Sequence, residues 1–251
     1  MDLGQIALLL VAGVAAGVIG STAGLASLVS YPALLLVGLS PVAANVTNTV
    51  GLIGSSIGSV SGSRLELTGL AAVVHRRAPI AVTGGALGAV ALLLGPPGSF
   101  ETVVPFLVAL ASVLLLLSPR LRRIHHAATS ARRPDGGVGV DVLVLLCCVY
   151  GGYFGAAAGV MLLAALLSRT DRLLPVSNAV KNLLLGLANG TAAVIFATRA
   201  PVDWVAVAPL LVGCVAGGWF GPALVRRVPP AVLRWVIGLA GLALAVRLAT
   251  Q

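Results

Sequence analysis

Charged residues are scarce in this chain of 251 residues. Asp, Glu, Lys and Arg together make up 9%, and only seven residues are acidic, whereas globular domains average about 25% charged. Hydrophobic residues make up 59%, and the mean hydropathy is +1.08. Polar side chains are too few to cover a soluble particle of this length. The composition therefore predicts a protein of the lipid bilayer.

Groups for catalysis, metal binding and redox chemistry are also missing. The three cysteines lie in apolar runs, and the adjacent Cys147 and Cys148 lack the C-x-x-C spacing. His125 and His126 are adjacent in a polar segment, so they cannot share a helix face as metal ligands do. No acidic residue pairs with a histidine at a useful spacing. We therefore expect no enzyme activity, no cofactor and no metal site.

The position of the positive charge argues against nucleic acid as a partner. The formal net charge is +9, but the arginines lie in short connectors between apolar runs, and no basic stripe alternates with aromatic residues. Such connectors are typical of cytoplasmic loops beside membrane spans. The N-terminal apolar run has no basic region before it, which predicts a retained membrane segment instead of a cleaved signal peptide.

An internal duplication organises the chain. Each copy has an apolar arm, a glycine-punctuated break, a second apolar arm, a proline and a helix with an Asn-rich beginning. An internal repeat of this kind indicates the architecture of the whole chain, which no local signal does. The positions Gly17, Gly20, Gly24, Pro41 and Asn48 recur as Gly152, Gly155, Gly159, Pro175 and Asn182.

Both copies are predicted to contain a broken helix or a tight hairpin inside the membrane. The first apolar stretch, about residues 4–38, is too long for one span of about 20 residues and too short for two. A break at Gly20–Gly24 gives two arms of about 16 residues, each about 24 Å long. The second stretch, about 138–167, breaks at Gly155–Gly159. A helix that restarts after a break points unpaired N–H groups and a positive dipole end at the gap, which suits an anion.

The rest of each half is predicted to be three transmembrane helices. We expect an all-α polytopic membrane protein with a first repeat over 1–118, a basic linker over 119–137 and a second repeat over 138–251. Small residues spaced by four along 41–63 indicate close helix packing. The predicted helices cover 41–63, 78–94, 102–117, 175–197, 201–225 and 231–248.

The positive-inside rule sets the orientation. With the arginine-rich linker in the cytoplasm, each half is one returning broken stretch plus three crossings. Three is odd, so the two halves have opposite orientation. The charge distribution thus predicts an inverted repeat, which is a recurrent transporter plan.

Polar residues that surround the breaks and open the two following helices are the candidate ligands of a small anion. Their alternative role is hydrogen bonding between helices, which contributes about 0.6 kcal/mol per bond in a membrane bundle. The predicted substrate-binding residues are Ser21, Thr22, Gly24, Asn45, Thr47, Asn48, Gly155, Gly159, Asn178, Lys181, Asn182 and Asn189.

Two ionisable residues require separate attention. Lys181 is the only lysine and lies in an apolar helix. A cation at the centre of a span costs about 2.5 kcal/mol or more, so Lys181 either attracts the anion from inside the protein or extends to the cytoplasmic interface. Asp141 is the deepest acidic residue, and it is either an ion-coupling residue or an acid in the first turn of a helix.

These motifs resemble the TauE/SafE (sulfite exporter) family of bacterial membrane permeases, and the resemblance covers nearly the whole chain. It rests on the two G-x-x-G-x-x-x-G stretches, and on the segment 31–35. It also includes Pro41, Asn45 and Asn48 in the first half and Asn178, Lys181, Asn182 and Asn189 in the second. The resemblance implies transport of small sulfur-containing or carboxylate anions, such as sulfite, thiosulfate or sulfonates, across the bacterial inner membrane.

A secondary transporter for a small anion is the leading functional hypothesis. The anion would bind in mid-membrane between the two breaks, and the halves would rock about it to give alternating access. Two other hypotheses stay open, namely a passive anion channel and a non-transporting membrane scaffold subunit. The sequence leaves the oligomeric state undefined.

Overall fold

The structure is a computed structural model that describes residues 1–96, 98–127, 137–170, 172–225 and 230–249. All secondary structure within these residues is α-helical apart from turns, which confirms the predicted fold class. The helices are α1 (Leu3–Ala23), α2 (Ser27–Leu36), α3 (Pro41–Gly51), α4 (Ile53–Gly62), α5 (Ala71–Leu94), α6 (Ser99–Ala127), α7 (Val138–Tyr153), α8 (Ala158–Arg169), α9 (Leu174–Arg199), α10 (Trp204–Val225) and α11 (Pro230–Ala249).

The first helix of the chain breaks where the glycines predict it. α1 ends at Ala23, and Gly24 adopts the left-handed conformation with φ +74° while its N–H donates to the Gly20 and Ile19 carbonyls. This is a standard helix stop that favours glycine. The chain restarts as α2 at Ser27. The two arms are unequal, 21 and 10 residues, so the prediction of equal arms is wrong.

The second break repeats the first by a different local route. α7 ends at Tyr153 and α8 starts at Ala158. Gly155 has φ +79°, and Ala157, directly before α8, has φ +64°. A non-glycine residue in this conformation is disfavoured by about 1–2 kcal/mol. The break is therefore held in place by the side chains packed around it, because Phe154, Ala156, Ala157 and Ala158 are all buried.

Two further elements differ from the sequence prediction. The helix expected over 41–63 is two helices, α3 and α4, which are interrupted at Leu52. α6 does not stop near residue 117 but continues to Ala127, so the expected linker begins as helix. The rest of that linker, 128–136, lies outside the described residues.

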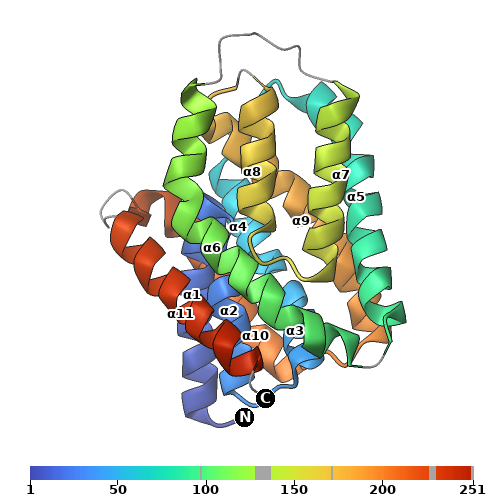
Figure 1. Cartoon of the computed structure of the whole chain (residues 1–251), viewed down its shortest axis with the longest axis vertical. Coiled ribbons are helices and arrows are strands. Elements are labelled where there is room, and N and C mark those ends of the chain that lie inside the picture. The colour runs from blue at the N-terminus through green and yellow to red at the C-terminus, as the bar shows by residue number, and fades with distance from the viewer. Residues whose placement is uncertain (97, 128–136, 171, 226–229, 250–251) are drawn as a thin grey trace.

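Each half packs its first helix against the other half. α1 lies along α10, and α7 lies along α5. In Figure 1, α1 starts at the lower end of the molecule, near the N-terminus, whereas α7 starts at the upper end. Glycines permit the close approach: a Cβ added to Gly13 or Gly17 would lie 2.5 Å from a carbonyl oxygen of α10. Gly54 and Gly58 on α4 also meet the α10 backbone, so their predicted packing role is confirmed.

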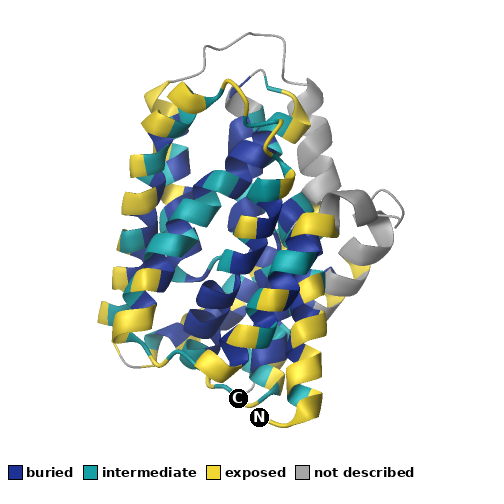
Figure 2. Cartoon of the chain, turned by 180° about the vertical axis from the view of Figure 1, so that it is seen from behind, coloured by how far each residue is buried: buried dark blue, intermediate teal, exposed yellow. Residues whose placement is uncertain are grey.

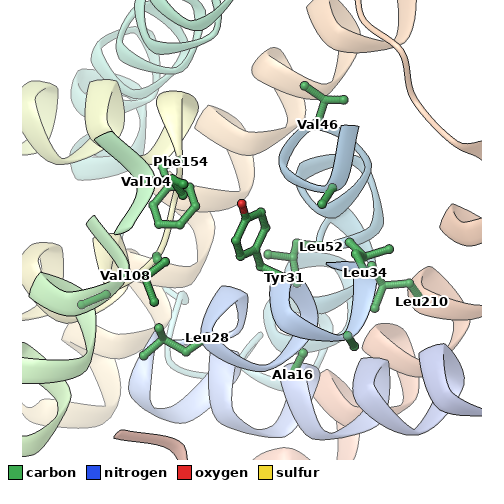
Figure 3. Packing of buried hydrophobic residues seen from close by; sticks show 14 of the residues in the cluster. Ala16, Leu28, Tyr31, Leu34, Val46, Leu52, Val104, Val108, Phe154 and Leu210 are labelled. Carbon is green, nitrogen blue, oxygen red and sulfur yellow. The ribbon is translucent and has the colours of Figure 1, made fainter. Parts of the chain in front are cut away.

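Aromatic side chains fill the main core beside the second break. Tyr31 on α2 packs edge-on against Phe154, with ring centroids 5.4 Å apart, and Phe100 on α6 lies 5.8 Å from the same ring. Figure 3 shows Tyr31 among Leu28, Val104 and Phe154, with its hydroxyl pointing away from Ala16. α2, α6 and the α7–α8 break therefore form one packed unit.

The outer surface is apolar, as a bilayer requires. Large hydrophobic side chains are exposed around the helix bundle, among them Leu94, Phe106, Val194 and Trp219. Figure 2 shows exposed residues on the outer helix faces and buried residues along the interior. Within the described residues, α1, α5 and α9 are long and apolar enough to cross a membrane, and several apolar helices are shorter.

Candidate functional site

A small pocket lies between the two breaks. Its volume is about 50 Å³, enough for about three or four water molecules or a small solute of similar size. The breaks contribute glycine backbone, α4 contributes serine side chains, and α9 contributes asparagine side chains. The lining residues are Gly20, Gly24, Ala26, Ser27, Leu52, Ser55, Ser56, Ser59, Gly155, Ala158, Gly159, Asn182, Leu185 and Asn189.

The breaks meet each other at this pocket. A Cβ added to Gly24 would lie 2.5 Å from the Cα of Gly159, the residue that occupies the equivalent place in the second copy. The two backbones are thus in direct contact in the interior of the bundle. Interrupted helices that face one another in this way can line a cavity without exposing polar backbone to lipid.

Two helix N-termini end at the pocket without a side-chain cap. α2 follows Ala26 and α8 follows Ala157, and neither residue caps its helix through a side chain. Ala26, Ser27, Ala158 and Gly159 all line the pocket. The first N–H groups of a helix have no intrahelical acceptor and carry the positive end of the helix dipole. Some of these N–H groups donate to the turn before the helix, as Leu28 does to the Leu25 carbonyl and Ala158 to the Gly155 carbonyl, so the two helix dipoles are the main positive contribution of the backbone to the pocket.

The C-terminal ends of the broken helices are capped by side chains from the opposite half. The Asn178 and Asn182 amides on α9 donate to the Ser21 carbonyl of α1, at 2.9 and 3.1 Å. The Asn45 amide on α3 donates to the Tyr153 carbonyl of α7 at 2.8 Å. These bonds satisfy carbonyls at the C-terminal ends of α1 and α7 and connect each break to the other half.

Lys181 takes part in the same arrangement. Its side chain is fully buried, and Nζ donates to the Gly20 carbonyl at 3.3 Å. Gly20 lines the pocket, while Lys181 itself does not. An ammonium at the C-terminal end of α1 complements the helix dipole. Lys181 therefore lies inside the protein. Its ammonium group binds the backbone of Gly20, and Gly20 in turn lines the pocket.

The predicted site residues fall into three groups. Gly24, Gly155, Gly159, Asn182 and Asn189 line the pocket. Asn178 and Lys181 bind the carbonyls of the first break from behind the wall.

The third group makes structural contacts outside the pocket. The Ser21 and Thr22 hydroxyls both donate to the Val18 carbonyl within α1. Thr47 accepts the Asp203 backbone N–H at the start of α10. Asn45 and Asn48, on α3, are buried but do not line the pocket; Asn45 donates to the Tyr153 carbonyl and Asn48 accepts from the Ser30 hydroxyl.

The serines of the pocket were missed as ligands. Ser55, Ser56 and Ser59 on α4 and Ser27 on α2 all line it. Ser55 and Ser59 are spaced by four residues, which is visible in the sequence, but that spacing indicates helix packing equally well. The sequence does not show which role applies. In the fold, α4 contributes serines to the pocket wall and also packs against α10.

No group of three or more His, Cys, Asp or Glu side chains that could hold a metal occurs in the described part of the chain. The three cysteines are free and buried. The site is thus built from backbone amides, hydroxyls and side-chain amides. These uncharged groups can donate hydrogen bonds to the oxygen atoms of a solute.

An ion-paired cluster joins the two halves away from the pocket. Asp141 lies in the first turn of α7 and accepts from Arg76 at 2.6 Å and from Arg77 at 3.3 Å. The side chain of Arg77 is 2% exposed and that of Arg76 is 47% exposed. Asp141 is therefore an acid at a helix start, and it holds α7 against α5.

Asp141→Asn should lower the free energy of unfolding by about 1–2 kcal/mol, because it leaves the buried Arg77 guanidinium without a charged partner. Thermal melting in detergent measures this. Asp2→Asn is the control, since Asn replaces Asp at an exposed helix cap with little cost. Equal melting of the Asp141 variant and the wild type would show that the pair contributes nothing.

The described geometry defines a class: a multi-pass helical membrane protein whose two interrupted helices meet at an interior pocket. The family model described as "Sulfite exporter TauE/SafE" matches residues 9–248. The chain belongs to the TauE/SafE family, which confirms the resemblance seen in the sequence.

Two curated relatives agree with this placement. The chain is 27% identical over 241 residues to "Probable membrane transporter protein YfcA" of Escherichia coli K12, covering 93% of this chain and 85% of the relative. It is 29% identical over 158 residues to "Probable membrane transporter protein ORF9" of a Sinorhizobium species, covering 61% of this chain and 58% of the relative. No solved structure matches the chain.

Proposed function

We propose that the protein is a secondary transporter that binds a small anion between the two breaks and carries it across the bacterial inner membrane. The observation that carries this proposal is the convergence of two uncapped helix N-termini, from α2 and α8, on one pocket. Family membership and the names of the relatives support a membrane permease. The same evidence argues against an enzyme.

The electrostatics of the pocket support an anionic solute. No acidic side chain is among its described lining residues. The helix N-termini supply N–H donors, and the Ser and Asn side chains supply further donors that can bind oxygen atoms. The buried Lys181 adds a full positive charge nearby. A sulfur oxyanion, an organosulfonate or a small carboxylate fits these donors, and the family description points to sulfite.

The arrangement of the halves supports alternating access about this pocket. α1 packs on α10 of the other half, and α7 packs on α5. The first helices of the two halves start at opposite ends of the molecule (Figure 1). These reciprocal contacts are what an inverted repeat produces, and rocking of one repeat against the other about a fixed site is its usual mechanism. The arginine-rich linker 119–137 is assigned to the cytoplasm by the positive-inside rule.

A passive anion channel with the same fold is the second candidate. A carrier binds its solute before each conformational change, so its flux saturates with concentration, whereas single-channel currents would identify a channel. A non-transporting scaffold subunit is less well supported, because a scaffold has no need for buried polar groups around a pocket. Flux measurements in proteoliposomes over a range of anion concentrations separate these functions.

Small oxyanions should stabilise the purified protein in a thermal-shift assay, by about 2.7 kcal/mol at a concentration 100-fold above the dissociation constant. Asn189→Leu should weaken the affinity about tenfold, because it removes a pocket hydrogen bond to a charged ligand. The control is Thr198→Val, since the Thr198 hydroxyl is exposed at the far end of α9 and bonds only within that helix. Absence of any shift across the anion panel would refute the proposed function.

A further inference from the structure

Glycines that place one helix backbone directly against another define two bundles of three helices, and in the first bundle α10 lies between α1 and α4. A Cβ added to Gly17 of α1 would lie 2.5 Å from the Cys214 carbonyl oxygen of α10. A Cβ added to Gly58 of α4 would lie 2.5 Å from the Val215 carbonyl oxygen of the same helix. Gly51, at the end of α3, also faces α10. We call α1, α4 and α10, with the end of α3 that leads into α4, the α10 bundle.

In the second bundle α5 lies between α7 and α9. A Cβ added to Gly88 of α5 would collide with the Val149 carbonyl of α7. A Cβ added to Gly85 would collide with the Ala188 carbonyl of α9. The ion pairs of Asp141 also join α7 to α5. We call α5, α7 and α9 the α5 bundle, and Figure 1 shows α5 and α7 side by side along one edge of the molecule.

Each bundle contains one helix exchanged from the other half of the sequence. α1 and α4 belong to the predicted first repeat, but α10, which lies between them, belongs to the second. α7 and α9 belong to the second repeat, but α5 belongs to the first. In the duplication α1 corresponds to α7, and the segment α3–α4 corresponds to α9, so the same exchange occurs twice. Because small residues that bring backbones into contact pack membrane helices closely, the packed units are the two bundles and not the two halves.

The contacts between the bundles are of a different kind. α4 and α9 face each other through a side chain, since a Cβ added to Gly186 of α9 would lie 3.0 Å from the Ser56 Cβ. Among the described glycines, only Gly24 and Gly159 place backbone against backbone across this boundary, at the two breaks. The Lys181 ammonium of α9 also donates to a carbonyl near the end of α1. The direct backbone contact between the bundles is therefore concentrated at the breaks.

The pocket lies on the boundary between the bundles. Gly20 of α1 and the α4 residues Ser55 and Ser59 line it from the α10 bundle. Asn182 and Asn189 of α9 line it from the α5 bundle. Packed helices move past one another more easily where side chains meet than where backbones interlock. A relative rotation of the bundles would therefore change the opening of the pocket and preserve the helix contacts inside each bundle.

We propose that the α10 bundle and the α5 bundle are the two rigid bodies of alternating access, and that they rotate about the contact between Gly24 and Gly159. This inference rests on the proposed function. Rotation of one whole repeat against the other would separate α1 from α10 and α7 from α5, where the backbones touch. Rotation of the bundles leaves those contacts intact, because each exchanged helix moves with the half against which it packs.

Two disulfide pairs of similar geometry test this assignment. Ser56→Cys with Gly186→Cys joins the two bundles, and Gly51→Cys with Leu210→Cys lies inside the α10 bundle. The Cβ separations are 3.0 Å and 3.4 Å, respectively, close to those of natural disulfides. Cys214→Ala is included in every protein, because Cys214 lies one turn from position 210. Mass spectrometry establishes that each disulfide has formed.

Sulfite is the probe, and its saturable uptake is measured in proteoliposomes before and after oxidation. The disulfide between the bundles should lower uptake at least about 20-fold, and reduction should restore it, because turnover needs the conformational change. The disulfide inside the α10 bundle should leave uptake within about twofold of its reduced form. The oxidised single variants Ser56→Cys and Gly186→Cys are the controls for the side-chain changes alone, and each should match its own reduced form.

Spin labels on lipid-facing positions provide a second measurement that leaves the interior unchanged. Val11 of α1, Ile57 of α4 and Leu146 of α7 are exposed. Pulsed electron paramagnetic resonance should give the same distance between labels at 11 and 57 with and without sulfite. The distance between labels at 57 and 146 should change.

The two measurements also distinguish failure of this inference from failure of the proposed function. Retained uptake with the bundles linked, equal loss in both linked pairs, or a sulfite-dependent change only between positions 11 and 57 would overturn the inference. Saturable uptake by the wild-type protein would leave the proposed function intact in each case. Absence of saturable uptake by the wild type, for sulfite and for every other anion of the panel, would refute the proposed function and this inference with it.

Discussion

Gly159→Ala is expected to abolish transport and to lower the unfolding midpoint by about 10 °C. Gly159 is in the first turn of α8, where alanine is otherwise a better helix former than glycine. Here, however, the new methyl group would collide with the backbone of Gly24. Backbone atoms cannot rotate away as a side chain does. Overpacking of this kind costs about 1–3 kcal/mol or more, and the relief of the collision would separate the two breaks.

The control for this substitution is Gly190→Ala. Gly190 lies inside α9, and a Cβ added there meets nothing within 4 Å. Alanine should therefore be neutral or stabilise the helix by up to about 1 kcal/mol. Melting in detergent and anion uptake in proteoliposomes are measured for both variants. Wild-type melting and uptake in the Gly159 variant would show that contact between the two breaks is not needed for the site.

The positions of the two breaks could be predicted because their signals are local. The glycine spacing repeats in both copies, and no uninterrupted helix of 35 residues fits the membrane thickness. The interruption at Leu52 has no such signal, since Leu52 and its neighbours are compatible with a continuous helix. It depends on how α3 and α4 pack against other helices, which a single sequence does not reveal.

The roles of the polar residues could be predicted less well than their locations. Asn and Thr side chains at the start of α3 and α9 suit either a ligand or another helix, and the sequence contains nothing that separates these uses. In the structure Asn178 and Asn182 cap a helix of the opposite half, a contact between residues 157 and 161 positions apart. Contacts of that range are set by topology. The serines of α4 were open to the same ambiguity and turned out to line the pocket.

The two copies differ at one informative position. Thr47 and Lys181 each directly precede the matched asparagine, Asn48 or Asn182, in the repeat. Thr47 accepts a backbone N–H at the start of α10, while Lys181 donates to the Gly20 carbonyl of α1. The duplication therefore supplies two similar backbone breaks, and the lysine makes the electrostatics of the two halves unequal.

Lys181→Met is expected to weaken anion affinity by about 30-fold. At an effective dielectric constant of about 20, a unit charge about 8 Å from an anion contributes about 2 kcal/mol. Methionine has a similar shape but no charge, and it leaves the Asn178 and Asn182 bonds to Ser21 in place. The stability of the anion-free protein should fall little, because the cost of burying a charge is also removed. Dissociation constants from thermal-shift titrations, and melting without anion, measure the two effects.

Lys181→Arg separates charge from shape. It keeps the positive charge and so should retain affinity within a few-fold, although the larger guanidinium needs space near Gly20. A purely structural role for the lysine predicts the reverse pattern in Lys181→Met, which is a lower melting temperature with an unchanged dissociation constant. That pattern would remove Lys181 from anion recognition. Weak binding in Lys181→Met with near-normal binding in Lys181→Arg would establish that the positive charge at position 181 contributes to anion binding.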